Sequence, residues 1–381
     1  MKKRTLFSLL SAMTLSLMLF SCEKGDEENL KQGRIEYKTY PYEEDIWLEI
    51  VAQELTIDWG DGTIEHFSPL GEPQQLNHHY DVWSLKTIQI SVDGMTYFRR
   101  QLVDGWDIQS AEKRFDELRF IHCSELQEIH CPFMGLVVLE IDKAESLTTL
   151  DCTFNKLVQL NLNGCPSLAN LYCMNNHLIN LNIDQCTVLK NLWCINNQLT
   201  ALELNASETL TMLMCGNNRI NSLNLSNYKT LQHLVCNYSN VFYGSGSGVY
   251  YIHSGKYLYT NYTNRQRSSF KSNDDGILQP IDNENKTKNP PLTDIRLSGC
   301  NALISMSCEN NQVATIDVKG CTSLEYLSCK HNELTANVLN TIFESLPVSH
   351  TKEAEIRITG NPGNDNCLEE IVTNKGWNIN K

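Results

Sequence analysis

Motifs that would identify a common enzyme class are absent from this sequence of 381 residues. It has no H-E-x-x-H zinc-protease motif, no phosphate-binding G-x-x-x-x-G-K and no dinucleotide-binding G-x-G-x-x-G. The 10 histidines form no group with metal-ligand spacing, and no pair of carboxylates is singled out as an acid and a base. The sequence therefore identifies no catalytic residue and no metal site, implies no cofactor, and favours a protein that is not an enzyme.

Basic residues are also scarce. The chain has 31 Lys and Arg against 45 Asp and Glu, a formal net charge of −14. Nucleic acids and anionic lipid headgroups attract basic surfaces, so an acidic chain is a poor candidate for binding either. We therefore expect no nucleic-acid partner, and contact with a membrane only through an N-terminal lipid anchor.

Long hydrophobic runs are limited to one, Leu6 to Phe20, which follows a basic start at residues 2–4. A basic start and a short apolar stretch are typical of a secretory signal peptide, not of a transmembrane helix. The run ends in LFSC at residues 19–22, which resembles a bacterial lipobox with Phe20 as an imperfect match. The resemblance implies cleavage after residue 21 and acylation of Cys22.

This resemblance sets the expected N-terminal organisation and location. Residues 1–21 would be the signal peptide, and residues 22–33, which lack apolar periodicity, a lipidated tether. The acidic stretch after Cys22 is similar to the surface-export signal of Bacteroidetes lipoproteins. Several acyl chains anchor a protein stably, and the resemblance implies that the anchored protein lies in the outer membrane, facing the cell exterior.

Closely paired cysteines are missing as well, since none of the 15 cysteines belongs to a C-x-x-C motif. Cysteine recurs instead at a step of 21 residues, and leucine and asparagine columns keep the same step. The unit is L-x-x-L-x-C-x-x-N-x-L-x-x-L-x-L, and a fixed period of this size predicts a solenoid of stacked coils. The cysteines of this strand series are Cys131, Cys152, Cys173, Cys194, Cys215, Cys236, Cys308 and Cys329.

The unit resembles the leucine-rich repeat, in a short cysteine-containing form. The Leu and Cys of L-x-C are two residues apart, so on a strand both point into the core. Stacked strands then place successive cysteines about 4.8 Å apart as small apolar groups. We expect the Asn amides to bind backbone groups where each coil turns. Disulfides between adjacent coils are the alternative for an oxidising compartment, whereas zinc would need four convergent ligands.

The rest of the chain divides around the solenoid. Residues 34–105 read as short strands with DWGDG at 58–62 as a turn, and resemble a PKD-type or immunoglobulin-like β-sandwich. The solenoid is predicted over 106–338, with an insertion at 241–291 that contains a Tyr-rich hairpin. Residues 339–381 read as helix, strand and helix, similar to the C-terminal cap of bacterial leucine-rich-repeat proteins. The expected fold is mostly β with some α.

A candidate binding surface lies on the outward side of the predicted strands. The residue between each inward Leu and Cys, and the residue after each Cys, face away from the core. In the middle coils these positions are apolar or aromatic, and an exposed patch of this kind is typical of a binding site. The predicted site comprises Tyr172, Met174, Trp193, Ile195 and Met214, with His130 and Asp151 beside them and Tyr250, Tyr251, Tyr257 and Tyr259 of the insertion as a second wall.

These features favour a monomeric, lipid-anchored adhesion protein whose concave repeat face and insertion bind a protein or peptide ligand. Glycan binding, with Tyr172 and Trp193 stacked on sugar rings, is the first alternative. A structural envelope spacer without a dedicated ligand is the second. The patch itself has a further interpretation, in which the insertion or the sandwich folds over it and makes it intramolecular core.

Overall fold

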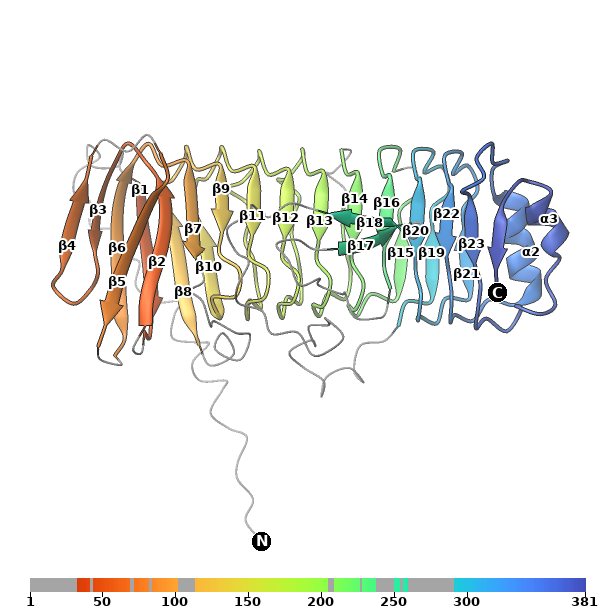
Figure 1. The fold of residues 1–381 in the computed structure, drawn as a ribbon, viewed down its shortest axis with the longest axis horizontal. Helices are drawn as coiled ribbons and strands as arrows, with labels where there is room; N and C mark the ends of the chain where they lie inside the picture. Colours follow the sequence, from red (N-terminus) through yellow and green to blue (C-terminus); the bar gives the residue numbers. More distant parts are fainter. Residues whose placement is uncertain are drawn as a thin grey trace, which may run out of the picture. The chain divides into compact units, whose positions relative to one another are not determined.

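The structure is a computed structural model, and it describes residues 33–41, 44–68, 72–81, 84–101, 114–204, 209–226, 228–237, 250–253, 256–259 and 291–381. All of them belong to one compact unit, Gln32–Lys381. Strands dominate this unit, and its described helices lie near the C-terminus (Figure 1). The predicted signal peptide, almost all of the tether, and Cys22 lie outside the described residues.

The solenoid is built on one long sheet to which each coil adds a three-residue strand. These strands pair in parallel with the coil before and the coil after, and Figure 1 shows them side by side in chain order. They are β9 (Glu128–His130), β11 (Thr149–Asp151), β12 (Asn170–Tyr172), β13 (Asn191–Trp193), β14 (Met212–Met214), β16 (His233–Val235), β20 (Ser305–Ser307) and β22 (Tyr326–Ser328).

The register of this sheet confirms the 21-residue period. Leu171 lies opposite Leu192, and residues that meet across neighbouring strands are 21 positions apart. Between β16 and β20 the partners are 72 positions apart, as for His233 and Ser305. The extra length matches the predicted insertion at 241–291, after which the same stack of coils resumes.

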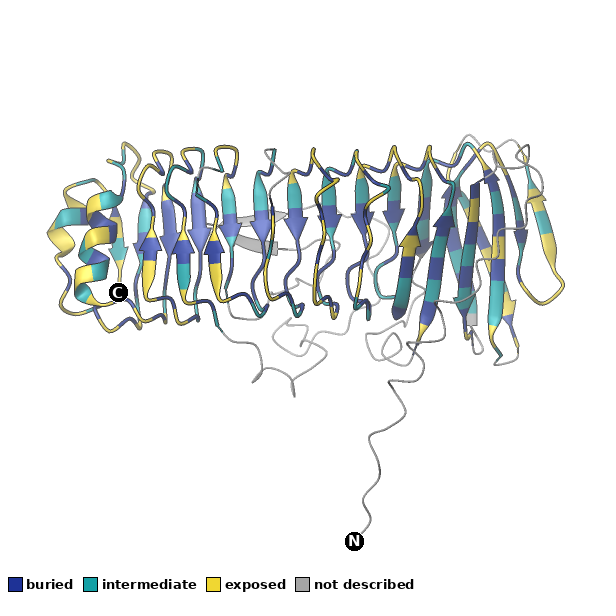
Figure 2. Cartoon of the chain, turned by 180° about the vertical axis from the view of Figure 1, so that it is seen from behind, coloured by how far each residue is buried: buried dark blue, intermediate teal, exposed yellow. Residues whose placement is uncertain are grey.

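The Leu and Cys columns form the interior, as predicted. Leu171, Leu192 and Cys194 are each 0% exposed, and the leucines and cysteines of successive coils belong to one hydrophobic core. Figure 2 shows buried segments recurring from coil to coil along the stack. Burial of these apolar side chains is the main favourable contribution to the fold, since each stabilises by roughly 1.5–3 kcal/mol.

The Asn column confirms its predicted role in binding the backbone. Asn176 Nδ2 donates hydrogen bonds to the carbonyl oxygens of Cys152 and Cys173 at 3.0 and 3.1 Å, and its Oδ1 accepts from Leu157 N–H at 3.0 Å. Each coil turns at the residue just before this column, where φ is positive, as in Asn175 at 55°. The same bonds recur at Asn197, Asn218, Asn311 and Asn332.

The opposite side of the solenoid carries shorter stretches of sheet. Three parallel strands form a separate sheet there, with β15 next to β19 and β19 next to β21. The bounds of these strands are β15 (Ser222–Asn224), β19 (Asp294–Arg296) and β21 (Thr315–Asp317).

The seven N-terminal strands lie in two sheets that also contain solenoid strands. β4, β3, β6 and β1 belong to a six-stranded sheet that continues into β8 and β10, and β5, β2 and β7 belong to the 13-stranded sheet. Their bounds are β1 (Gly33–Thr39), β2 (Glu44–Val51), β3 (Glu54–Asp58), β4 (Ile64–Phe67), β5 (Gln74–Tyr80), β6 (Lys86–Asp93), β7 (Tyr97–Gln101), β8 (Asp116–Ile121) and β10 (Leu136–Ile141).

Several contacts cross the predicted boundary between residues 105 and 106. β7 pairs in parallel with β9, and β1 pairs antiparallel with β8. The Phe98 and Phe120 rings meet edge to face at 5.1 Å, and Tyr37 Oη donates a 2.7 Å hydrogen bond to the buried Asp116 carboxylate. The N-terminal strands therefore cover the first coil and share its core.

The two aspartates of the DWGDG segment form the side-chain-to-backbone hydrogen bonds that are typical of turns. Asp58 Oδ1 accepts a hydrogen bond from Gly60 N–H, and Asp61 Oδ1 accepts one from Thr63 N–H. The strand β5 has a weak sequence signal, because only Leu76 and Tyr80 mark its buried face among polar residues.

The C-terminal elements follow the predicted order of helix, strand and helix. They are α2 (Ala336–Ser345), β23 (Glu355–Arg357) and α3 (Glu369–Thr373), followed by β24 (Asn378–Asn380). β23 and β24 extend the long sheet beyond β22, so its last edge strand is β24. Leu339, Ile342 and Phe343 of α2 are buried in the common core.

Candidate functional site

The outward face of the long sheet carries side chains that alternate with the core residues. We call the third residue of each solenoid strand the outward row. Register pairs its members one after another across the sheet, so that they form a continuous line perpendicular to the strands. The row runs His130, Asp151, Tyr172, Trp193, Met214, Val235, Ser307 and Ser328.

The apolar residues predicted for the site do come together. A hydrophobic cluster separate from the main core contains Met174, Trp193, Ile195 and Met214, with Tyr172, Met212 and Val235 packed against it. We call these seven residues the outward cluster. Met212 was not among the predicted residues. It lies two residues before Met214, and the period of two along a strand places both on the same face.

The expectation that this patch is open to solvent is wrong for the described structure. Trp193 is 2% exposed, and Ile195 and Met214 are each 1% exposed. The outward row is just as buried outside the cluster, at Asp151 (1%) and Ser328 (0%). Side chains stacked at the spacing of adjacent strands, about 4.8 Å, cover one another. The accessible part of the cluster is therefore its rim, where Tyr172, Met212 and Val235 are only half-buried.

The two aromatic rings of the cluster, Tyr172 and Trp193, pack against each other. The ring centroids of Tyr172 and Trp193 are 4.3 Å apart with planes tilted by 51°. Burial, with a smaller contribution from the Asp151 carboxylate, raises the pKa of Tyr172 to about 12. A sugar ring stacks on a flat, open aromatic face, and Trp193 does not present one in this arrangement. The geometry therefore favours packing against apolar side chains over stacking on a glycan.

The N-terminal flank of the cluster is polar. His130 lies 3.1 Å from Glu128 through Nε2, and this hydrogen bond lowers the pKa of Glu128. Asp151 is buried next to Tyr172 in the row, and its Oδ1 accepts a hydrogen bond from Thr153 N–H at 3.0 Å. His130 and Asp151 thus lie where the sequence predicted, and their polar atoms bind neighbouring protein groups.

The C-terminal flank is also polar but has smaller side chains. Ser307 Oγ donates a 2.8 Å hydrogen bond to Asn237 Oδ1, and Ser328 Oγ donates one to Glu309. Lys330 Nζ lies 3.7 Å from Glu309, so the carboxylate has a cationic neighbour. The outward face therefore changes from polar to apolar and back to polar along the stack of coils.

Two rows of side-chain amides border the cluster on either side. Asn191 Nδ2 donates to Asn170 Oδ1 at 2.7 Å, in the column that precedes the inward leucines. On the other border, Asn196 donates to Asn175 and Asn217 donates to Asn196, each at 2.7 Å. The cluster thus lies between rows of directional donors and acceptors that repeat from coil to coil.

The insertion contributes one described element, the predicted hairpin. β17 (Tyr250–His253) and β18 (Lys256–Tyr259) pair antiparallel, with Tyr250 opposite Tyr259. The rest of the insertion up to residue 290 lies outside the described residues. The role predicted for Tyr250, Tyr251, Tyr257 and Tyr259 remains a prediction.

The cysteines are packing groups in the described part of the chain. All 14 cysteines there are free and buried, so disulfides between coils are not formed. In the same part of the chain, no group of three or more His, Cys, Asp or Glu side chains is arranged to hold a metal ion. Burial raises the pKa of the thiols, to about 12 for Cys165, Cys215 and Cys329.

These raised pKa values predict that the protein loses stability in alkali. Between an ordinary thiol pKa of 9.0 and the folded value of about 12, the unfolded chain releases thiol protons that the folded chain retains. The stabilising effect of burial is full below pH 9 and declines as the pH rises toward 12. Urea midpoints from pH 8 to 11 under reducing conditions should fall steadily, and a midpoint that stays constant would contradict buried, protonated thiols.

The comparisons with known proteins come from solved structures alone, since no protein-family profile and no curated protein matches the chain. The chain is similar to the functional domain of InlJ from Listeria monocytogenes, which includes a cysteine ladder, with 21% identity, a TM-score of 0.37 and 64% of this chain covered. The match spans 47% of that InlJ chain, about half its length.

A second similar structure is a leucine-rich-repeat protein of Leptospira interrogans. It is 17% identical, with a TM-score of 0.25, and the match covers 73% of this chain and 81% of that one. Among the described residues, no helix is long and apolar enough to cross a membrane.

Proposed function

We propose that the chain is a non-enzymatic binding protein whose outward sheet face engages a protein or peptide ligand. The observation that carries the proposal is the outward cluster, a second apolar cluster on the side of the sheet that faces away from the core. A solenoid is stabilised mainly by its inner columns, so the stacking of coils does not require a second apolar cluster on the other face. Trp, Tyr and Met are enriched in the centres of protein interfaces.

The rim of the cluster and its borders supply the contacts in this proposal. Tyr172, Met212 and Val235 would meet apolar ligand groups, and the amide rows would bind polar groups of the ligand backbone. The buried residues Trp193 and Met214 would hold the rim in place. Tyr250, Tyr251, Tyr257 and Tyr259 of the insertion remain part of the proposed surface.

The ligand class is tested by presenting residues 33–381 to a displayed peptide library and to a glycan array. We expect peptides rich in apolar residues to be selected. Tyr172→Ser, at the accessible rim, should weaken their binding at least about tenfold, as for an interface anchor. Trp193→Ser should weaken it indirectly, because the rim loses the side chain that holds it in place. Ile179→Ser is the matched control, because Ile179 is 44% exposed and belongs to neither cluster. The proposal would be contradicted if glycans bind and no peptide is selected. It would also be contradicted if the selected peptides bind both serine variants normally.

We also propose that the protein is a lipoprotein of the outer membrane, held through Cys22 and facing the exterior. The support is the residue 19–22 match to a lipobox after a basic and apolar leader. Cys22→Ser should abolish incorporation of a labelled fatty acid and release the protein from the membrane fraction. Continued acylation of that variant would show that Cys22 is not the anchor, and protease treatment of whole cells tests the outward orientation.

A further inference from the structure

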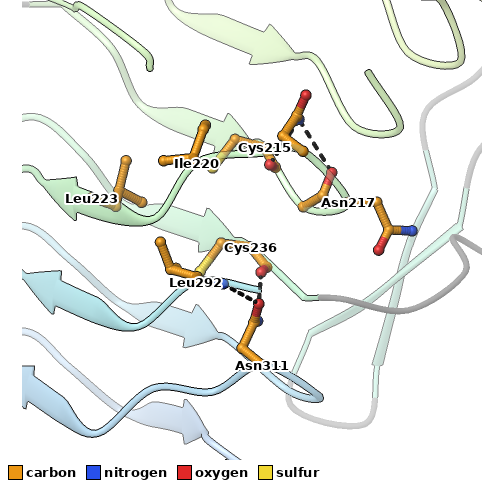
Figure 3. A pocket seen from close by; sticks show the side chains of 9 residues that line it. Cys215, Asn217, Ile220, Leu223, Cys236, Leu292 and Asn311 are labelled. Atoms are coloured by element: carbon orange, nitrogen blue, oxygen red, sulfur yellow. Dashed lines mark hydrogen bonds between the residues drawn. The ribbon is translucent and has the colours of Figure 1, made fainter. Parts of the chain in front are cut away.

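A cavity lies between two members of the Asn column, next to the point where the insertion interrupts the repeat. Asn218 and Asn311, the column members on either side, both line a cavity of about 20 Å³ (Figure 3). A space of this size holds one molecule as small as water.

The cavity reaches two thiols of the strand series. Cys215 and Cys236 line it together with apolar groups such as Ile220 and Leu292. Cys215 is 5% exposed and Cys236 is 4% exposed. The other members of the series are each 0% exposed: Cys131, Cys152, Cys173, Cys194, Cys308 and Cys329.

The two thiols belong to adjacent coils. They directly follow Met214 and Val235, which are register partners in β14 and β16, and Cys215 N–H donates a 2.9 Å hydrogen bond to the Val235 carbonyl. Neighbouring strands lie about 4.8 Å apart, inside the Cα separation of about 4.4–6.8 Å that disulfides span.

We propose that Cys215 and Cys236 are an oxidation site in a strand series of cysteines that is otherwise inaccessible to solvent. A small peroxide enters the cavity and converts the two thiols into a disulfide between adjacent coils. The remaining strand-series thiols stay reduced, because no solvent reaches them. The inference rests on the cavity and the thiol pair, and it is independent of the proposed ligand.

The chemistry needs only the peroxide as oxidant. The sulfur of one thiol attacks a peroxide oxygen, the O–O bond breaks, and the products are a sulfenic acid and one water that carries the thiol proton. The second thiol then attacks the sulfenic sulfur, the S–O bond breaks, and a second water leaves with the second proton. Two thiols are oxidised, and the peroxide is reduced to two waters.

The environment makes the reaction slow but selective. Burial raises the pKa of Cys215 to about 12, so the reactive thiolate is rare at neutral pH. Oxidation should therefore lag well behind that of a solvent-exposed cysteine. Cys123 and Cys367, which lie outside the strand series and are 4% and 8% exposed, serve as internal references for access without an adjacent cavity and partner.

The test treats the native, reduced full chain with hydrogen peroxide, then unfolds it, blocks the remaining thiols with iodoacetamide and maps its peptides by mass spectrometry. We expect a Cys215–Cys236 cross-link to form first, with loss of both free thiols while Cys152, Cys173 and Cys308 stay free. Cross-links spread along the strand series would overturn the proposal. So would oxidation confined to Cys123 and Cys367, or no loss of any strand-series thiol.

Variants identify the intermediate. In Cys215→Ala, Cys236 has lost its partner, so peroxide should leave a sulfenic acid that dimedone traps at that position. Cys152→Ala, in a coil away from the cavity, is the matched control and should form the same Cys215–Cys236 cross-link as the unmodified protein. Dimedone adducts on Cys173 or Cys194 in either variant would show that the rest of the strand series is accessible.

Discussion

A chain that begins at residue 106 is expected not to fold into a stable solenoid. Removing the N-terminal strands takes β7 from the edge of β9 and β1 from the edge of β8, so two rows of strand backbone groups lose their partners. The buried Asp116 loses the hydrogen bonds from Tyr37 and Thr39. Asp116 keeps its ion pair with Arg114 at 3.1 Å, but core side chains that the N-terminal strands cover, such as Phe120, become exposed. A domain whose stability is about 5–15 kcal/mol is not expected to tolerate the combined loss.

Circular dichroism and thermal melting of the truncated chain provide the measurement. A chain that lacks most of 241–290 is the matched control, because β16 and β20 pair directly and need no intervening residues for their register. We expect the control to melt cooperatively and the truncated chain to aggregate or stay unfolded. Cooperative melting of the truncated chain at an unchanged temperature would mean that the two parts are independent domains.

Replacing Asn176 by alanine is expected to lower the free energy of unfolding by about 2–4 kcal/mol. The side-chain amide is buried, and its Oδ1 is the acceptor for Leu157 N–H. Without it that N–H has no acceptor in the turn, and the Cys152 and Cys173 carbonyls each lose one donor. The carbonyls keep a second donor, Asn155 and Asn197 respectively, which limits the loss.

Urea unfolding followed by circular dichroism measures this change. Asn182→Ala is the matched control: Asn182 is an exposed asparagine of the same coil, whose Oδ1 accepts only the local bond from Asp184 N–H. The control should change the free energy of unfolding by less than about 1 kcal/mol. Equal effects of the two substitutions would show that the Asn column does not hold the turns together.

The sequence predicted the solenoid well because each structural role is repeated in it. A single L-x-C stretch is ambiguous, but eight copies at one spacing leave only one register in which every Leu and Cys is inside. Leu192 and Cys194 in the core and Trp193 in the second cluster follow directly from that register. The extent of the insertion followed in the same way, from the point where the repeat stops and resumes.

Features that occur once were harder to predict. The polar strand β5 has too few apolar residues for its pattern to be recognised, and the pairing of β7 with β9 depends on two segments with no shared motif. The burial of Trp193 depends on how bulky neighbours cover one another, which alternation along a strand does not specify. The cavity next to Cys215 depends on how the side chains around it pack, which the repeat pattern does not specify.

Hydrogen exchange of residues 33–381, with and without a peptide selected from the displayed library, tests the proposed recognition surface most directly. The account predicts slower exchange on binding in β12, β13, β14 and β16, the strands that carry the outward cluster. Exchange on the opposite side, in β15, β19 and β21, should be unaffected by the peptide. Protection concentrated in those three strands, or in the N-terminal strands, would contradict a binding surface formed by the rim of the outward cluster.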